Sequence, residues 1–246
     1  MSVQHVQSVI TAAGDSRPLF LPSGFGSPKG LVLWHDQEVI INALESYVIN
    51  LDRACVAVHK EEDTEWGISS VISRKFPAVR IVKIRPGTLG ALASALVAME
   101  GVDPDIPLVV AAGDSVVKGG ISGQIKKFQA MNVDAATIAF QSQNPRWSYL
   151  SVDPYGAVRQ VQEKRVIGPL ATTGVFYFRT ARQFLSAAQW VLVNNAMNNG
   201  VYYVSTTLNY MISQGLNVYY STIPRDQYAS FSLPSDFRPE RTDSLD

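Results

Sequence analysis

The chain has 246 residues, 46% of them hydrophobic and 17% charged, so it is long and apolar enough to bury a sizeable core. Its 21 basic and 21 acidic side chains balance, so nothing indicates a nucleic-acid partner, and no apolar run approaches the ~18 residues of a membrane span. The single cysteine excludes an internal disulfide, and the three histidines are too scattered for a histidine-based metal site. Because the sequence has no recognisable export signal, we expect a soluble cytoplasmic protein.

The first predicted strand ends in a loop of small residues. Ala12, Ala13 and Gly14 carry almost no side chain, so backbone N–H groups in this loop can approach a phosphate. Arg17 follows with a cationic fork, and Lys29 adds a mobile point charge. This combination predicts a triphosphate site, although an ordinary turn beside two surface cations would have the same residues.

Apolar spacing predicts alternating strands and helices through the rest of the first half. The helices are expected at residues 38–48, 63–75 and 91–99. The strands are expected at residues 53–58, 79–84 and 107–112. Buried strands that alternate with helices favour a parallel sheet covered on both faces, which binds ligands at the carboxyl ends of its strands. The small-residue loop, the turn at Gly87 and Asp114 all fall at such ends.

The second half is predicted to be mixed. Strands are expected at residues 135–140, 149–152, 157–161, 175–178 and 217–222. Helices are expected at residues 123–131, 181–193 and 205–214. The turn sequence Asp153-Pro154-Tyr155-Gly156 joins two of the strands in a hairpin.

Asp114 and the turn that precedes it are candidates for nucleotide chemistry. A carboxylate that faces a phosphate loop can hold Mg²⁺, which takes one or two carboxylates plus substrate phosphates, but an aspartate here could also cap a turn. Gly87, Thr88 and Gly90 could let the backbone approach a base or ribose, or they could form a plain helix entry with Thr88 as N-cap.

Further candidates lie in the second half. Glu163 and Lys164 offer a cation for a second phosphate, or they form a solvated surface pair. Residues 172–174 suit a polyol or sugar, or they mark a β-bulge. Trp147 and Tyr149 could wall a ligand, although aromatics beside a hairpin are more often core. Because no Ser–His–Asp or Cys–His set can be assembled, an enzyme with this sequence would act by aligning phosphates and neutralising their charge.

Together these segments resemble the sugar-phosphate nucleotidyltransferases, and in particular the branch found in capsule and surface-polysaccharide loci. The resemblance covers about residues 9–237. In the first half it rests on Ser16-Arg17 with Pro28-Lys29, on Gly87-Thr88-Leu89-Gly90-Ala91 and on Ala111-Ala112-Gly113-Asp114. The capsule branch is indicated by Pro145-Arg146-Trp147-Ser148-Tyr149, by Glu163-Lys164 and by Ala171-Thr172-Thr173-Gly174-Val175-Phe176-Tyr177-Phe178.

The resemblance implies a Rossmann-like three-layer α/β/α fold of the GT-A-like nucleotidyltransferase type. Its central sheet would be mixed but predominantly parallel, with a small hairpin-containing acceptor-binding part. A single domain would span residues 1–237, with a nucleotide-binding half (1–132) and an acceptor-binding half (133–237), followed by a loose tail (238–246). The implied reaction joins a nucleoside triphosphate (NTP) to a sugar 1-phosphate, with Mg²⁺, to give an NDP-sugar and pyrophosphate.

By position, the resemblance also assigns roles to the candidate residues. The catalytic residues would be Arg17, Lys29 and Asp114, with Asp114 as the metal ligand. The nucleotide would contact Ala12, Ala13, Gly14, Ser16, Gly87, Thr88 and Gly90. The acceptor would contact Gly113, Trp147, Tyr149, Glu163, Lys164, Thr172, Thr173 and Gly174. The partners would thus be small phosphorylated molecules, with no nucleic acid or membrane, and a homo-oligomer is left open.

Two departures from the family pattern leave other functions open. Asp15 occupies the second glycine position of the signature loop, or the loop is one residue short, and a carboxylate there repels a triphosphate unless it turns away or shares the metal. Ser230 stands where many relatives carry a second metal aspartate. The chain could therefore be a weak or inactive domain that binds a nucleotide or sugar phosphate. A glycosyltransferase of the related fold is a further alternative, but Asp114-Ser115-Val116 lacks the expected Asp-x-Asp motif.

Overall fold

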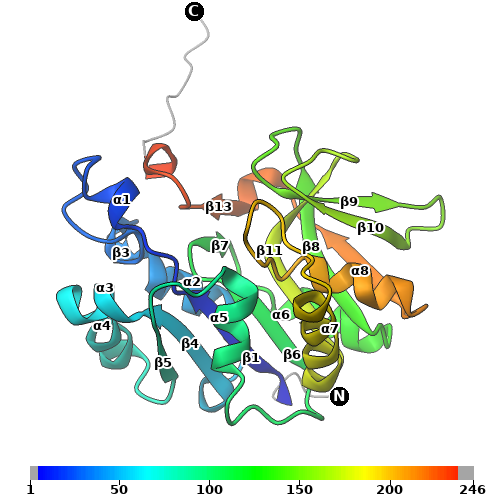
Figure 1. Cartoon of the computed structure of the whole chain (residues 1–246), viewed down its shortest axis with the longest axis horizontal. Coiled ribbons are helices and arrows are strands. Elements are labelled where there is room, and N and C mark those ends of the chain that lie inside the picture. The colour runs from blue at the N-terminus through cyan, green and yellow to red at the C-terminus, as the bar shows by residue number, and fades with distance from the viewer. Residues whose placement is uncertain (1–4, 238–246) are drawn as a thin grey trace, which may run out of the picture.

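The structure is a computed structural model that describes residues 5–237. Its strands in the main sheet are β1 (Gln7–Ala12), β4 (Ala54–His59), β5 (Arg80–Ile84), β6 (Leu108–Ala112), β8 (Ala135–Gln141), β9 (Ser148–Val152), β10 (Val158–Glu163), β11 (Leu170–Phe178) and β12 (Val218–Thr222). Two short pairs lie outside it: β2 (Leu33–Trp34) with β3 (Gln37–Glu38), and β7 (Ser115–Val117) with β13 (Tyr228–Ser230). Figure 1 shows the main sheet running through the molecule.

The main sheet of the described residues has nine strands, with β10-β9-β11-β6-β1-β4-β5 as its longest path. Strand β1 pairs in parallel with β4 and β6, and β4 pairs in parallel with β5. Strand β11 is antiparallel to β6, β8 and β9, and β8 continues in parallel to β12. The predicted mixed, predominantly parallel sheet is therefore confirmed, and β11 joins its two halves.

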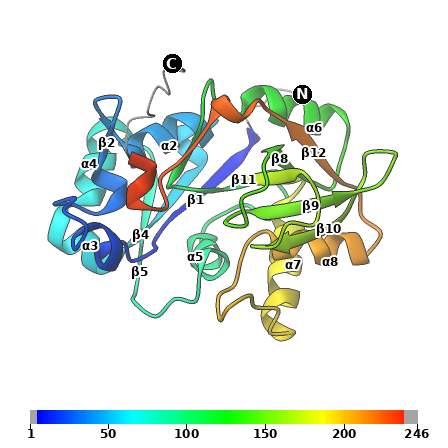
Figure 2. The same cartoon turned by 90° about the horizontal axis from the view of Figure 1, so that it is seen from above.

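Helices cover both faces of the sheet. They are α2 (Val39–Tyr47), α3 (Lys60–Trp66), α4 (Ile68–Lys75), α5 (Ala91–Ala98), α6 (Ser122–Ala130), α7 (Ala181–Val193) and α8 (Thr206–Ser213), with the single turn α1 (Arg17–Phe20) beside the first loop. Figure 2 shows α2, α4 and α6 on one side of the sheet and α5, α7 and α8 on the other. The predicted three-layer α/β/α fold is confirmed.

Alternation along the buried strands produces the two cores. Ile10 and Val56 pack in the core that holds α2, α4 and α6, while Val9 and Ala57 pack in the core that holds α5, α7 and α8. Successive side chains of a strand point to opposite faces, so a strand in the centre of three layers must be apolar or hydrogen-bonded on both faces, as Ser8 of β1 is to the Tyr47 carbonyl. This requirement explains why continuous apolar runs identified the central strands.

Helix α7 lies where its apolar spacing predicts it. The hydroxyl of Thr180 accepts the N–H of Gln183, and the Gln183 side chain accepts the N–H of Thr180. This capping box satisfies N–H groups that the first turn of a helix leaves free.

The single helix predicted at 63–75 is wrong, because Gly67 breaks it into α3 and α4. Gly67 has φ of 68° and acts as the C-cap of α3, a left-handed conformation that glycine adopts without a steric penalty. The Asp63 carboxylate then accepts the N–H of Ser69 at 2.6 Å, which anchors the start of α4.

The division of the chain at residue 132 stays a prediction, and the tail predicted from Arg238 lies outside the described residues. Across residues 5–237, the helices are all too short or too polar to cross a lipid bilayer.

Candidate active site

Two adjoining cavities open at the carboxyl ends of the parallel strands. The first-loop cavity, of about 260 Å³, lies between the loop after β1 and the segment after β5. The hairpin cavity, of about 410 Å³, lies between β11, the β9–β10 hairpin and residues 203–205. The two cavities share Thr11, Ala91, Ala112 and Asp114. The Asp114 carboxylate therefore lies where the cavities meet.

The turn after β6 positions Asp114. The N–H of Gly113 donates to the Thr11 carbonyl at 2.9 Å, which holds the turn against β1. A Cβ at Gly113 would lie 2.8 Å from the Ala12 Cβ, so only glycine fits this approach. The N–H of Phe231 donates to the Asp114 carbonyl at 2.8 Å, so the backbone of Asp114 is fixed from both sides.

Lys29 is the ion-pair partner of Asp114. Its Nζ lies 2.7 Å from Oδ2 of Asp114, and each side chain is 22% exposed. Burial acts to raise the pKa of Asp114, but the charge and hydrogen bond of Lys29 outweigh it, so the pKa is lowered. The Ser232 hydroxyl adds a long hydrogen bond to the same oxygen, at 3.4 Å. The carboxylate is thus kept ionised at the junction of the cavities.

This ion pair predicts that part of the protein's stability is sensitive to acid. Because the folded chain lowers the pKa of Asp114, the pair contributes fully above the ordinary value of 3.8 and is lost as pH falls through the folded value. We expect the free energy of unfolding in urea to fall below about pH 4, and to fall less in Asp114→Asn. An equal fall in both proteins would contradict this assignment.

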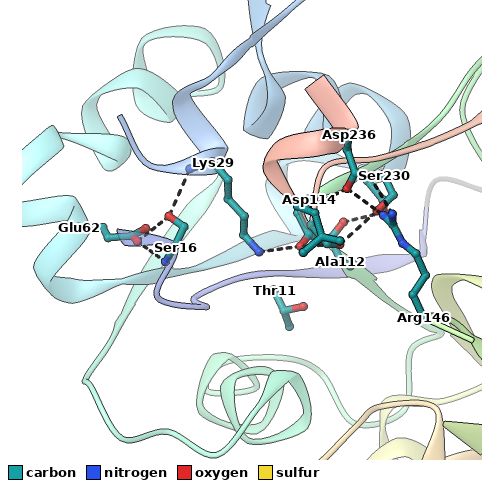
Figure 3. A network of polar contacts seen from close by, with 12 residues as sticks. Thr11, Ser16, Lys29, Glu62, Ala112, Asp114, Arg146, Ser230 and Asp236 are labelled. Atoms are coloured by element: carbon teal, nitrogen blue, oxygen red, sulfur yellow. Dashed lines mark hydrogen bonds and ion pairs between the residues drawn. The ribbon is translucent and has the colours of Figure 1, made fainter. Parts of the chain in front are cut away.

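A buried carboxylate holds the first loop in the conformation that brings Lys29 to Asp114. Both the backbone N–H and the hydroxyl of Ser16 donate to Oε1 of Glu62 at 2.6 Å, and Glu62 is 3% exposed. The N–H of Lys29 donates to the Ser16 hydroxyl at 3.2 Å. Figure 3 shows the resulting chain of polar contacts from Glu62 through Ser16 and Lys29 to Asp114. The sequence did not predict Glu62, whose one local signal is its place in the acidic first turn of α3.

Arg17 lies apart from this pair. Its guanidinium contacts both oxygens of Asp15, at 3.0 and 2.9 Å, and Glu61 at 2.6 Å. The hydrogen bond from Arg17 is the main reason why the pKa of Asp15 is lowered. The negative charge at the second glycine position is thus balanced by the neighbouring arginine.

The first-loop cavity collects most of the residues predicted for the nucleotide. Those that line it are Ala13, Gly14, Gly87, Thr88 and Gly90. Gly90 has φ of 97°, and a Cβ there would lie 2.6 Å from the Tyr202 carbonyl oxygen, so the segment after β5 packs tightly on residues 201–202. The alternative that Thr88 is the N-cap of α5 is wrong: Gly90 is the N-cap, and the Thr88 hydroxyl donates to the Arg85 carbonyl at 2.9 Å.

The hairpin cavity collects most of the residues predicted for the acceptor. Those that line it are Trp147, Glu163, Lys164, Thr172, Thr173 and Gly174. Oε2 of Glu163 accepts the hydroxyl of Ser205 at 2.7 Å and that of Ser148. Nζ of Lys164 lies 5.7 Å from the centre of the Tyr203 ring and has no ion-pair partner within residues 5–237. Lys164 is therefore a free cation at this cavity in the described part of the chain.

The β-bulge that the sequence left open is present in β11. The register of β11 against β8 shifts between Thr172 and Phe176, and Gly174 has φ of 78°. A Cβ at Gly174 would lie 3.4 Å from the Ala112 Cβ. The bulge therefore brings backbone into the cavity wall beside the end of β6.

Five predicted site residues do not line either cavity: Ala12, Ser16, Arg17, Gly113 and Tyr149. Tyr149 is fully buried and its hydroxyl donates to the Asn144 carbonyl at 2.7 Å, as expected of a core aromatic. Ser16 accepts the backbone N–H of Lys29, and Gly113 forms the turn that carries Asp114. Direct ligand contact by these five residues stays a prediction.

Solved structures share this architecture. A nucleoside-diphosphate-sugar pyrophosphorylase from Vibrio cholerae RC9 has a TM-score of 0.79 and 21% identity, over 94% of this chain and 98% of that one. This chain has a nucleotidyltransferase fold. A protein from Bacillus anthracis assigned as a glucose-1-phosphate thymidylyltransferase, in complex with sucrose, has a TM-score of 0.68 and 17% identity, over 89% and 87% of the two chains. The inositol-1-phosphate CTP transferase from T. maritima has a TM-score of 0.69 and 12% identity, over 96% and 93%.

At the level of sequence, no family model and no curated protein match the chain. The fold that the resemblance implies is thus confirmed, while membership of the capsule branch stays a prediction.

Within this fold, the C-terminal segment (residues 228–237) lies beside Asp114 and lines part of the hairpin cavity. Strand β13 pairs with β7, directly after Asp114. Arg146 then contacts Asp236 through two 2.8 Å hydrogen bonds and donates to the Ser230 hydroxyl at 3.1 Å. Figure 3 shows these contacts beside Asp114. Neither Arg146 nor Asp236 is among the predicted site residues, because their partnership joins positions 90 apart in the chain.

The C-terminal segment also packs on the first loop of this fold. The ring of Phe237 lies 5.6 Å from that of Phe20 and 5.4 Å from that of Phe25, centre to centre. Figure 1 shows this turn (red) beside α1 (blue). The C-terminal segment therefore contacts the first loop through Phe237, and it contacts Arg146, just before β9, through Asp236.

The ion pair between Arg146 and Asp236 is expected to stabilise the fold measurably. It is bidentate and largely buried, so Asp236→Asn should lower the free energy of unfolding by about 1–2 kcal/mol, as measured in urea. A double-mutant cycle with Arg146→Met isolates the pair. If the two changes add without coupling, the contact contributes nothing and the assignment is wrong.

Asp114 is the carboxylate that lines both cavities, so it is the candidate metal ligand of this site. Among the described residues there is no group of three His, Cys, Asp or Glu side chains that could hold a metal. Ser230 accepts from Arg146, and Ser232 rather than Ser230 reaches Asp114. This donor set fits an ion that takes one carboxylate and draws its other ligands from phosphate oxygens and water, as Mg²⁺ does.

Proposed function

We propose that the protein transfers a nucleotidyl group from an NTP to a sugar 1-phosphate or a similar phosphorylated acceptor. The products would be pyrophosphate and an NDP-sugar. The observation that carries the proposal is the meeting of two cavities at an ionised aspartate beside a lysine. Two cavities that share one charged junction suit a reaction between two bound molecules. The activities named for the three similar structures support the same reaction class.

Each substrate has a cavity with suitable chemistry. The NTP would occupy the first-loop cavity, with its base and ribose along residues 87–90 and its phosphates toward Lys29. The acceptor would occupy the hairpin cavity, with its phosphate near Lys164 and its hydroxyl groups along residues 172–174. In this arrangement the α-phosphate and the acceptor phosphate would lie on the two sides of Asp114.

In the proposed reaction, an oxygen of the acceptor phosphate attacks the α-phosphorus. A new P–O bond forms as the bond from the α-phosphorus to the bridging oxygen breaks, and pyrophosphate leaves with the electron pair. Lys29 and Lys164 would offset the repulsion between the two anions, and the cavity walls would hold the attacking oxygen in line. Mg²⁺ bound by Asp114 and phosphate oxygens would supply further charge neutralisation on the triphosphate.

We propose that the product serves the synthesis of capsule or other surface polysaccharide, because the motifs around Arg146 and residues 171–178 resemble that branch. We also propose that the reaction takes place in the cytoplasm.

The second candidate function is a domain that binds the same ligands without turnover. Asp15 in the first loop and Ser230 near Asp114 favour it, since both change the charge at the phosphate end of the site.

Pyrophosphate release tests the proposed function. ATP, CTP, GTP, UTP and dTTP would each be combined with a panel of sugar 1-phosphates and phosphorylated non-sugars, with Mg²⁺ or with EDTA. Release that requires an NTP, an acceptor and the metal supports the proposal. Binding of an NTP without release from any pair supports the second candidate instead.

A further inference from the structure

His59 presents an unpartnered ring nitrogen to the first-loop cavity. It is the last residue of β4 and the N-cap of α3, it is 3% exposed, and it lines the cavity. A polar side chain so deeply buried normally has all its hydrogen-bonding groups satisfied. Each of the two ring nitrogens of His59 would therefore be expected to have a hydrogen-bond partner.

One ring nitrogen of His59 has a structural partner and the other has none. Nδ1 accepts the backbone N–H of Glu62 at 3.4 Å. An accepting Nδ1 carries no proton, so the neutral ring has its proton on Nε2. Within residues 5–237, Nε2 makes no hydrogen bond. The ring thus offers an N–H donor that the described chain does not use.

Among residues 5–237, the charged side chains that line the cavity with His59 make no hydrogen bond to it. Both oxygens of Asp15 already accept from Arg17, and Asp114 accepts from Lys29. On the β5 side, His59 pairs in register with Ile84, and the next residue is the cation Arg85. Nε2–H is therefore available to an acceptor on a ligand in the cavity, and to water when the cavity holds no ligand.

We propose that His59 is a nucleotide-binding residue whose Nε2–H donates to an acceptor oxygen of the bound NTP. This inference rests on the proposed function. Strand β4 lies two strands from β6, or about 10 Å along the sheet edge, so His59 is remote from the reacting α-phosphorus. The oxygen it contacts belongs either to the nucleoside or to the outer phosphates of the same ligand.

Two substitutions separate the ligand contact from the structural contact. In His59→Asn, Oδ1 can replace Nδ1 as the N-cap acceptor, but nothing replaces Nε2. In His59→Gln, the side-chain amide reaches toward the position of Nε2, and the cap is lost. We expect His59→Asn to keep the wild-type unfolding midpoint in urea and to raise the Kd for an NTP about tenfold. His59→Gln should show the reverse: a lower midpoint and a Kd closer to the wild type.

The measurement is calorimetric binding of ATP, CTP, GTP, UTP, dTTP and inorganic tripolyphosphate, each with Mg²⁺, to the full chain. If His59→Asn raises the Kd for an NTP but not for tripolyphosphate, His59 contacts the nucleoside. If it raises the Kd for both, His59 contacts a phosphate. Wild-type affinity in His59→Asn overturns the inference while the proposed function stands. If the wild-type protein binds none of the NTPs, the proposed function fails and the inference fails with it.

Discussion

Replacing Asp114 with asparagine is expected to lower kcat about a thousandfold, the scale seen when a preorganised electrostatic group is removed from an active site. The change keeps the shape of the side chain but removes the charge at the junction of the two cavities, and with it the proposed metal ligand. Pyrophosphate release under saturating NTP and acceptor measures the effect.

Asp105→Asn is the matched control. Asp105 also pairs with an arginine, Arg182, but its side chain is 71% exposed and lies outside both cavities. Its substitution should leave kcat within about twofold, since exposed ion pairs contribute little. Near-normal turnover in Asp114→Asn, or an equal loss in the control, would remove Asp114 from the reaction.

Replacing Lys29 with methionine should reduce kcat/KM about a hundredfold, because it removes the proposed charge-assisted contact to the triphosphate. It should also raise the pKa of Asp114. The burial that acts to raise this pKa would remain, while the opposing charge and hydrogen bond of Lys29 would be gone. Steady-state kinetics give the first effect, and NMR titration of the Asp114 carboxyl carbon gives the second.

Lys75→Met serves as the control for Lys29→Met, because Lys75 also forms an ion pair with a carboxylate, that of Glu45, but at the surface. It should leave both kcat/KM and the Asp114 titration unchanged. If Lys29→Met changes the titration but not the kinetics, Lys29 supports Asp114 without contacting the nucleotide.

Structural features that depend on short stretches of the sequence were predicted correctly. The continuous apolar runs in β4 and β6 indicate strands buried on both faces, and the glycine before Asp114 marks the end of such a strand. Helix α7 has a regular apolar face and its own N-cap, so nothing remote is needed to define it. Strand ends that meet at one edge of a parallel sheet then bring Asp114 toward the first loop.

Features that depend on distant partners were not predicted. Strands β7 and β13 are three residues each and pair across the whole second half of the chain, with no local pattern to reveal them. The contact of Ser16 with Glu62 and that of Arg146 with Asp236 likewise join remote positions. Gly67 shows the opposite problem, because one glycine within an apolar helical pattern gives too little signal to predict a break.

The central claim is that the two cavities are the halves of one site that meets at Asp114. A crystal structure with a bound NDP-sugar tests this most directly, because that product would span both halves. The claim predicts the base beside residues 87–90, the sugar beside residues 172–174 and the diphosphate between Lys29 and Lys164, next to Asp114. An NDP-sugar held entirely within one cavity, with its diphosphate away from Asp114, would contradict it.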